Sequence, residues 1–198
     1  MNALRILIAE DEPLVAEGLR GHLEALGHRV AGIASDGAAA VAQAEATEPD
    51  LIFMDIQMPR LDGIQAAERI MAQRPVPIIV LTAHVDPPLV ERAMVTGAMG
   101  YLVKPVERKD LTPAIVLATT RFADLMALRN DARSLQEALG LRQQVERAKG
   151  ILATRMKLPE AKAHRGLQQF AQRERCTLAE AAARVIEAER FFAGLDDA

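Results

Sequence analysis

The most constraining feature of this sequence is a regular alternation between residues 4 and 103. Short runs rich in β-branched and other apolar residues lie at 5–9, 30–34, 51–54, 78–81 and 100–103. Alanine-rich segments of helical period separate them, at about 13–26, 37–47, 62–73 and 87–96, and a fifth begins at about 108. Apolar strands separated by helices form parallel sheets that are covered on both faces. The pattern therefore predicts a doubly wound α/β domain with a five-stranded parallel sheet.

Charge is distributed unevenly along this chain of 198 residues. Residues 1–110 carry ten Lys and Arg against sixteen Asp and Glu, whereas residues 134–176 carry nine against four. An acidic first half followed by a basic segment indicates that the two regions bind different partners. The single cysteine, Cys176, excludes an intramolecular disulfide, and the N-terminus lacks the pattern of a signal peptide. We therefore expect a cytoplasmic protein without a segment of membrane-spanning length.

Polar residues follow four of the predicted strands. Glu10 and Asp11 follow the first strand, Asp55 the third, Thr82 the fourth and Lys104 the fifth. Ligands of open α/β sheets bind beyond the carboxyl ends of the strands, so we expect these side chains at one edge. Three carboxylates make an all-oxygen pocket that suits Mg²⁺ and phosphoryl transfer. Asp55 would be the nucleophile, and Lys104 and Thr82 would contact the phosphoryl oxygens.

The cluster has two alternative interpretations besides a phosphoryl-accepting site. Acidic residues at strand ends often solvate loops and cap helices, although four strand ends together make that explanation weak. A phosphohydrolase with an aspartyl intermediate is the second alternative. Enzymes of the haloacid dehalogenase type carry a second Asp two residues after the nucleophile, where this chain has Gln57. Because no general acid stands there, we expect a site that stores one phosphoryl group, and a protein that is not an enzyme.

Four segments resemble the receiver domain of two-component response regulators: AEDEP at 9–13, MDIQMPRLDG at 54–63, LTA at 81–83 and YLVKP at 101–105. This resemblance implies the flavodoxin-like strand order 2-1-3-4-5. It also implies that a histidine kinase phosphorylates Asp55. Glu10, Asp11, Asp55 and the backbone carbonyl of Gln57 would then hold Mg²⁺, and the Lys104-Pro105 bond would be cis.

The same resemblance implies a conformational switch, because Thr82 and Tyr101 match the family's switch pair. A phosphoryl group on Asp55 would add about −1.5 to −2 charges and three acceptor oxygens. It would draw Thr82 inward, so that Tyr101 could pack into the space behind it. The expected result is a change in the helix at 87–96 and the strand beside it. A half-buried Tyr101 without a switching role is the alternative.

After Lys109 the strand pattern stops, and the chain becomes rich in Ala, Leu, Arg, Glu and Gln. Apolar residues there step by three and four: Leu125, Leu128, Ala132, Leu135 and Leu139. This short heptad-like stripe fits either a helix packed on its own domain or the seam of a dimer. Three short helices are expected beyond it, at about 141–156, 159–173 and 177–192.

These last segments resemble the ANTAR domain, a three-helix RNA-binding module of transcription antitermination regulators. The resemblance covers about 138–192 and is most specific at Ala148-Lys149-Gly150. Basic residues in and near the first of these helices could follow the phosphates of an RNA. The candidates are Arg142, Arg147, Lys149, Arg155 and Lys157.

Together, the two resemblances predict a response regulator that is controlled by phosphorylation and binds leader RNA hairpins to prevent transcription termination. Its predicted parts are a receiver domain at 1–120, a helical linker with a possible short coiled coil at 121–137, and an ANTAR domain at 138–198. Phosphorylation is expected to favour a dimer through the leucine stripe. The alternative is a response regulator whose helical output binds DNA or another protein.

Overall fold

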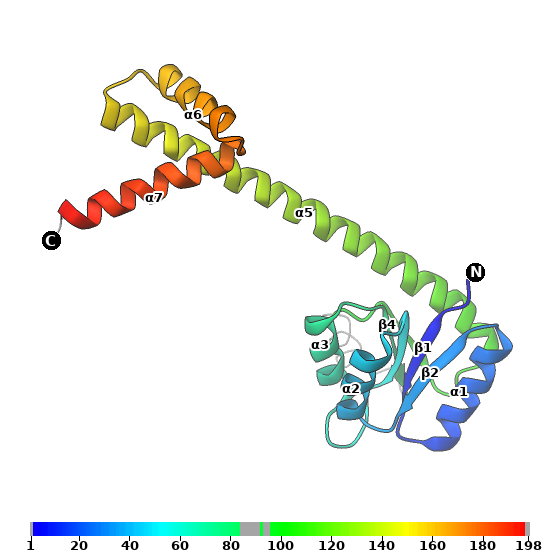
Figure 1. The fold of residues 1–198 in the computed structure, drawn as a ribbon. Coiled ribbons are helices and arrows are strands. Elements are labelled where there is room, and N and C mark those ends of the chain that lie inside the picture. Colours follow the sequence, from blue (N-terminus) through cyan, green and yellow to red (C-terminus); the bar gives the residue numbers. More distant parts are fainter. Residues whose placement is uncertain (1, 84–91, 93–95, 197–198) are drawn as a thin grey trace. The chain divides into compact units, whose positions relative to one another are not determined.

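The computed structural model describes residues 2–83, 92 and 96–196, with side chains described as far as residue 191. The chain divides into two compact units, Met1–Met126 and Ala127–Ala198. The first unit contains a β-sheet with helices on its faces, and the described part of the second is helical (Figure 1). The α/β domain and the helical module that follows it are therefore both present, as the sequence predicts.

Five parallel strands form the sheet in the order β2-β1-β3-β4-β5. They are β1 (Arg5–Ala9), β2 (Arg29–Ala34), β3 (Leu51–Asp55), β4 (Ile78–Thr82) and β5 (Gly100–Val103). The predicted strand positions and strand order are confirmed. Because β2 and β3 lie on opposite sides of β1, the winding reverses between β1 and β3, and that reversal marks the ligand-binding edge of such sheets.

Helices α1 (Pro13–Ala25), α2 (Gly37–Thr47) and α3 (Gly63–Gln73) follow the first three strands. Their starts are specified locally: Pro13 occupies the first turn of α1, and the side chains of Asp36 and Asp62 accept backbone N–H bonds at the starts of α2 and α3. The predicted helix at 87–96 lies outside the described residues, apart from residues 92 and 96.

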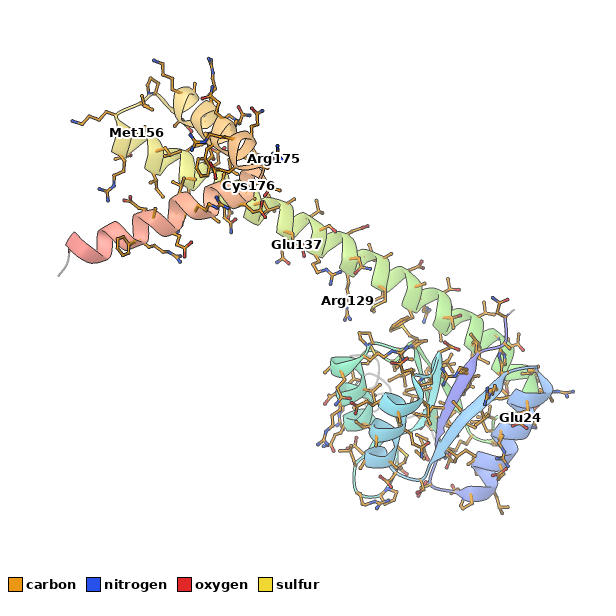
Figure 2. The ribbon with its side chains drawn as sticks, viewed as in Figure 1. Glu24, Arg129, Glu137, Met156, Arg175 and Cys176 are labelled. Carbon is orange, nitrogen blue, oxygen red and sulfur yellow. The ribbon has the colours of Figure 1, made fainter. Side chains whose placement is uncertain are left out.

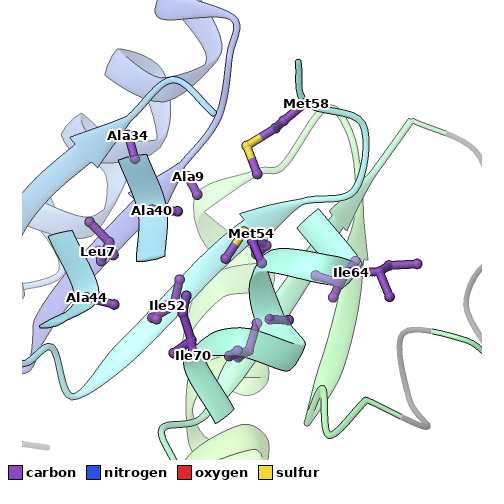
Figure 3. Packing of buried hydrophobic residues seen from close by; sticks show 14 of the residues in the cluster. Leu7, Ala9, Ala34, Ala40, Ala44, Ile52, Met54, Met58, Ile64 and Ile70 are labelled. Atoms are coloured by element: carbon purple, nitrogen blue, oxygen red, sulfur yellow. The ribbon is translucent and has the colours of Figure 1, made fainter. Parts of the chain in front are cut away.

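Side chains alternate between the two faces of the sheet, and each face has its own core. Leu7 and Ile52 point into a cluster with Ala40 of α2 and Ile70 of α3 (Figure 3). On the other face, Ile6, Ile8 and Phe53 pack against residues of α1 and of α5, the helix that follows β5: Leu19, Leu23, Leu111 and Ile115. Strands buried on both faces carry apolar residues at every position, which is why their sequences show no alternation.

Helix α5 (Arg108–Met156) is a single helix of 49 residues. The sequence predicted its parts separately, as a helix from about 108, a helical linker at 121–137 and a helix at 141–156. The structure joins all three, and helical backbone continues through Gly140. Helix propensity is high on both sides of this glycine, and one glycine costs only about 1 kcal/mol relative to alanine, so the helix does not end there.

By length and composition, α5 is the one helix among the described residues that could cross a membrane. The expectation that no segment reaches such a length is wrong by that criterion. Early in the helix, Leu111, Ile115 and Ala118 are buried against the sheet. Packing within the first unit thus accounts for the apolar character of these positions.

The second unit packs the end of α5 against α6 (Glu160–Glu174) and α7 (Leu178–Asp196). Met156 ends α5, and Arg175 and Cys176 lie in the turn between α6 and α7 (Figure 2). Alanines dominate its buried core: Ala148, Ala163, Ala171, Ala181 and Ala182, together with Leu167. A capping box starts α7, since the Glu180 side chain accepts the N–H of Thr177 and the Thr177 hydroxyl accepts the N–H of Glu180.

Candidate functional site

Strand ends bring three carboxylates and one lysine together at the edge where the winding reverses. Glu10 follows β1, Asp55 ends β3 and Lys104 follows β5. One oxygen each of Glu10, Asp11 and Asp55 lies within 4.8 Å of the others. Glu10 and Asp55 are buried, with 1 % and 5 % of their surface exposed, whereas Asp11 is exposed. Within this cluster, Asp11 is therefore the carboxylate that is exposed to solvent.

Lys104 is the cation of this cluster. Its Nζ donates to Asp55 Oδ2 at 2.6 Å and to Glu10 Oε1 at 2.8 Å. Among the described residues, this one ammonium faces three carboxyl groups at this edge. The sequence predicted that Lys104 would reach a phosphoryl group on Asp55, but it did not indicate the contact with Glu10. Nothing in the sequence shows that contact, because it depends on the positions of β1 and β5.

Burial and neighbouring charges perturb two of these groups. Burial raises the pKa of the Glu10 carboxyl, and repulsion from Asp55 adds to this rise, while Lys104 opposes it. For Lys104, burial lowers the pKa, but the hydrogen bonds and charges of Asp55 and Glu10 outweigh burial and leave the pKa raised. Lys104 is thus held as a cation, and an ionised Glu10 is less favourable here than in water.

The backbone after Asp55 holds its carboxylate in place. The N–H of Gln57 donates to Asp55 Oδ1 at 3.3 Å, and the N–H of Gly63 donates to the Ile56 carbonyl at 2.9 Å. A Cβ at Gly63 would lie only 1.8 Å from the Asp55 carbonyl oxygen, so this close approach requires glycine. Glycine at this position therefore lets α3 begin directly against the end of β3.

The donor set at this edge fits a hard divalent cation. Carboxylate oxygens are the ligands that Mg²⁺ and Ca²⁺ prefer. Glu10 Oε2 is buried and forms an ion pair with Lys104 Nζ at 2.6 Å. A carboxylate oxygen carries lone pairs beyond the one that faces a cation, so it can also bind a metal ion. The cluster is thus compatible with Mg²⁺, which is the ion expected from the sequence.

The expected switch residues occupy different environments. Thr82 ends β4 and is buried, with 4 % of its surface exposed, and its carbonyl accepts the Lys104 N–H at 2.8 Å. Tyr101 lies on β5 opposite Val80 and is 42 % exposed. In this structure Tyr101 is thus partly exposed rather than packed inward. The Lys104-Pro105 bond is cis, as predicted.

The predicted RNA-binding cations of the second unit do not form one surface of equivalent charges. Lys149 lies between Glu146 and Glu160, with Nζ to oxygen distances of 2.7 and 3.2 Å. Arg155 donates twice to Glu189, at 2.9 and 3.3 Å. The other candidates, Arg142, Arg147 and Lys157, are exposed and form no ion pair within the part of the chain that the structure describes. Three of the five candidates therefore have no ion-pair partner among the described residues.

Comparison with known proteins also divides the chain into two domains. Residues 6–116 match the response regulator receiver domain, and residues 133–186 match the ANTAR domain. The transcriptional regulatory protein PdtaR of Mycobacterium tuberculosis is 46% identical over 183 residues, which cover 92% of this chain and 89% of that protein.

Solved structures agree with the first of these matches. The signal receiver domain of a modulated diguanylate cyclase from Desulfovibrio desulfuricans G20 is 36% identical with a TM-score of 0.58, covering 62% of this chain and 98% of that one. A chain of the CheX-CheY-BeF3-Mg²⁺ complex from Borrelia burgdorferi is 26% identical with a TM-score of 0.54, covering 56% of this chain and 85% of that one. Both similarities therefore place the α/β unit among receiver domains.

Proposed function

This chain belongs to the response regulators, with a receiver domain followed by an RNA-binding antiterminator domain of the ANTAR type, and from that premise we propose that Asp55 stores the phosphoryl group that controls RNA binding. The observation that carries the proposal is the contact of Lys104 Nζ with Asp55 Oδ2 at 2.6 Å, beside two further carboxylates. A receiver domain implies a histidine kinase as the donor.

Transfer would proceed by attack of an Asp55 carboxylate oxygen on the phosphorus of a phosphohistidine. A P–O bond to Asp55 forms as the P–N bond to the histidine breaks, and the histidine leaves with the bonding electron pair. Lys104 would then exchange its bond to Asp55 Oδ2 for one to a phosphoryl oxygen, and the Thr82 hydroxyl would donate to a second oxygen. Little movement of Lys104 is needed, because it already contacts the acceptor.

Glu10, Asp11, Asp55 and the backbone carbonyl of Gln57 are the groups that would hold Mg²⁺ in this site. When bound, Mg²⁺ supplies positive charge that offsets the carboxylates and the phosphoryl oxygens. The related CheY complex with BeF3 and Mg²⁺ supports this choice of ion. The approach of carboxylate oxygens of Glu10, Asp11 and Asp55 to within 4.8 Å of one another supports it independently.

Storage fits the site better than turnover does. Proteins with these two domains are not typically enzymes. Gln57, two residues after the acceptor, offers an amide where a phosphohydrolase of the haloacid dehalogenase type has an acid. The phosphoryl group would therefore persist on Asp55 long enough to change the conformation around Thr82 and Tyr101.

Phosphorylation of Asp55 is tested with a small-molecule phosphodonor and intact-protein mass spectrometry. The wild-type protein is expected to gain one phosphoryl group in the presence of Mg²⁺, and Asp55→Asn is expected to gain none. Asp131→Asn, which removes an exposed carboxylate from α5, serves as the matched control and should label like the wild type. Labelling of Asp55→Asn would show that another residue is the acceptor.

The leucine stripe on α5 supports a dimer as the state that binds RNA. Leu125 packs partly against the core of the first unit. Leu128, Leu135 and Leu139 are 67%, 66% and 58% exposed, so packing on the helix's own domain does not account for them. Together with Ala132, these leucines repeat at steps of four, three and four, which is typical of a helical seam. We expect phosphorylation to raise the fraction of dimer in analytical ultracentrifugation, and two ANTAR domains to bind a leader RNA with two hairpins.

Binding of RNA rather than DNA is tested by competition. A labelled RNA hairpin bound to the phosphorylated protein is challenged with unlabelled hairpin or with duplex DNA of equal length at the same salt concentration. The hairpin should compete better, because charge attraction is common to both competitors and only specific contacts differ. Preference for duplex DNA would favour a DNA-binding output instead.

A further inference from the structure

An open groove runs between α5 and α7 in the second unit, with a volume of about 610 Å³. Gln143, Gln144 and Arg147 line it from α5. Ile186, Glu187 and Arg190 line it from α7. Apart from the half-buried Ile186, these side chains are exposed. The volume lies in the range of about 300 to 1,000 Å³ that is usual for ligand sites.

The two arginines of the groove differ from the other cations of this unit. Within the part of the chain that the structure describes, neither Arg147 nor Arg190 forms an ion pair, whereas Lys149 and Arg155 are neutralised by carboxylates. A guanidinium that is exposed and uncompensated can bind a phosphate through two parallel hydrogen bonds. The groove thus concentrates available positive charge, although Arg190 lies outside the set that the sequence indicated.

The remaining side chains of the groove suit a nucleobase. The amides of Gln143 and Gln144 each offer both a donor and an acceptor, which is what the edge of an unpaired base presents. Ile186 supplies an apolar surface for the face of a base or ribose. Glu187 accepts hydrogen bonds only, so it suits an exocyclic amino group and repels phosphate.

We propose that this groove holds unpaired nucleotides from the loop of an RNA hairpin. Arg147 and Arg190 bind the phosphates on either side, Gln143 and Gln144 read the base edge, and Glu187 favours a base with an amino group. This assignment rests on the proposed RNA-binding function and specifies where the RNA lies. It moves the recognition surface from the neutralised cations Lys149 and Arg155 to the α5–α7 groove.

The test uses the full-length protein and hairpin RNAs that share one stem and have a randomised loop. Binding is followed by fluorescence anisotropy over a range of salt concentrations. Arg147→Gln and Arg190→Gln should each weaken binding about tenfold and reduce the slope of log K against log salt by about 1, as loss of one phosphate contact requires. Arg165→Gln, an equal change of charge at an exposed position of α6 outside the groove, should change binding by less than about twofold.

A variant that should bind RNA more tightly distinguishes the loss of an RNA contact from a loss of folding. Glu187→Gln removes the one carboxylate of the groove. It should tighten binding of the hairpin pool about threefold and reduce the preference for loops rich in amino-bearing bases over loops of uridine alone. No unfolded protein would bind more tightly, and the exposed arginines make no described ion pair that their removal would break.

The outcomes distinguish failure of the proposed RNA-binding function from failure of the groove assignment. If the wild-type protein binds no hairpin, the proposed RNA-binding function and the groove assignment both fail. If the wild type binds but Arg147→Gln and Arg190→Gln bind equally well, only the groove assignment fails. Weakening by Arg165→Gln equal to that of the groove variants would also overturn it, since overall charge and not position would then determine affinity.

Discussion

Lys104 in the receiver domain and Lys149 in the ANTAR domain are each held between two carboxylates, but the carboxylates differ in burial. The partners of Lys104 are Glu10 and Asp55, whose side chains are 0% and 7% exposed. The partners of Lys149 are Glu146 and Glu160, whose side chains are 53% and 69% exposed. Charges withdrawn from water interact strongly, and charges that remain in water are screened. The same residue types therefore form a tightly constrained site in one unit and an adjustable surface in the other.

The cause lies in the elements that carry the charges. In the receiver, the side chains come from the ends of adjacent parallel strands, and the sheet order determines which residues meet. In the ANTAR domain they project from helix faces, so the partners depend on how α5 and α6 pack. The cores differ accordingly: isoleucines, leucines and Phe53 fill the core on one face of the receiver sheet, and alanines fill the core of the second unit. Rigidly held groups can make precise contacts with a phosphoryl group, whereas exposed groups on a helix face are accessible to an RNA.

The glycines beside the two sites provide the comparison with the largest expected effect. Ala at Gly63 would bring a Cβ to 1.8 Å from the Asp55 carbonyl oxygen, whereas a Cβ at Gly150, next to Lys149, meets nothing within 4 Å. Gly63→Ala should lower the free energy of unfolding of the receiver by about 3 kcal/mol or more, because backbone has to move. Gly150→Ala should raise that of the second unit by about 0.5 to 1 kcal/mol, because alanine favours helix. Urea unfolding of the full-length variants measures both changes in the free energy of unfolding. Near-equal losses of stability in the two variants would contradict this contrast.

Much of the receiver could be predicted from its sequence, because strand pattern and strand-end residues together specify the sheet and the cluster at its edge. The contact of Lys104 with Glu10 could not, since it joins residues that follow β1 and β5. In the second unit, Glu146 lies three residues before Lys149 on one helix and is visible as a partner. Glu160 and Glu189 become partners of Lys149 and Arg155 only when α6 and α7 pack against α5. Contacts between residues on helix faces are therefore harder to predict from the sequence than contacts between residues at strand ends.

Removal of each lysine tests the difference in burial directly. Lys104→Gln leaves three carboxylates with no cation, two of them buried, and should lower the free energy of unfolding by about 2 kcal/mol in the absence of divalent ions. Lys149→Gln leaves only solvent-exposed carboxylates and should have a much smaller effect. Added salt should reduce the effect of Lys149→Gln and leave most of the loss in Lys104→Gln, because a buried pair is poorly screened. Thermal melts at low and high salt measure the loss of stability in each variant. Equal losses in Lys104→Gln and Lys149→Gln would mean that burial does not distinguish the two sites.

The pH dependence of Glu10 provides the smallest effect and the sharpest test of the buried cluster. The pKa of Glu10 is raised above its ordinary value of 4.5 in the folded protein, mainly by burial. Its protonated form therefore adds stability that is fully present below pH 4.5 and is lost as the pH rises through the folded pKa.

Replacement of Glu10 by Gln keeps a neutral side chain at every pH. Without divalent ions, Glu10→Gln should thus match the wild type near pH 4 and be more stable at pH 7, by about 1 kcal/mol. Saturating Mg²⁺ should reverse the order at pH 7, because a ligand at 100 times its Kd stabilises the folded state by about 2.7 kcal/mol and the variant lacks one of its oxygens. Glu160→Gln, the matched change beside Lys149, should show no reversal with Mg²⁺, since its carboxylate lies outside the acidic cluster.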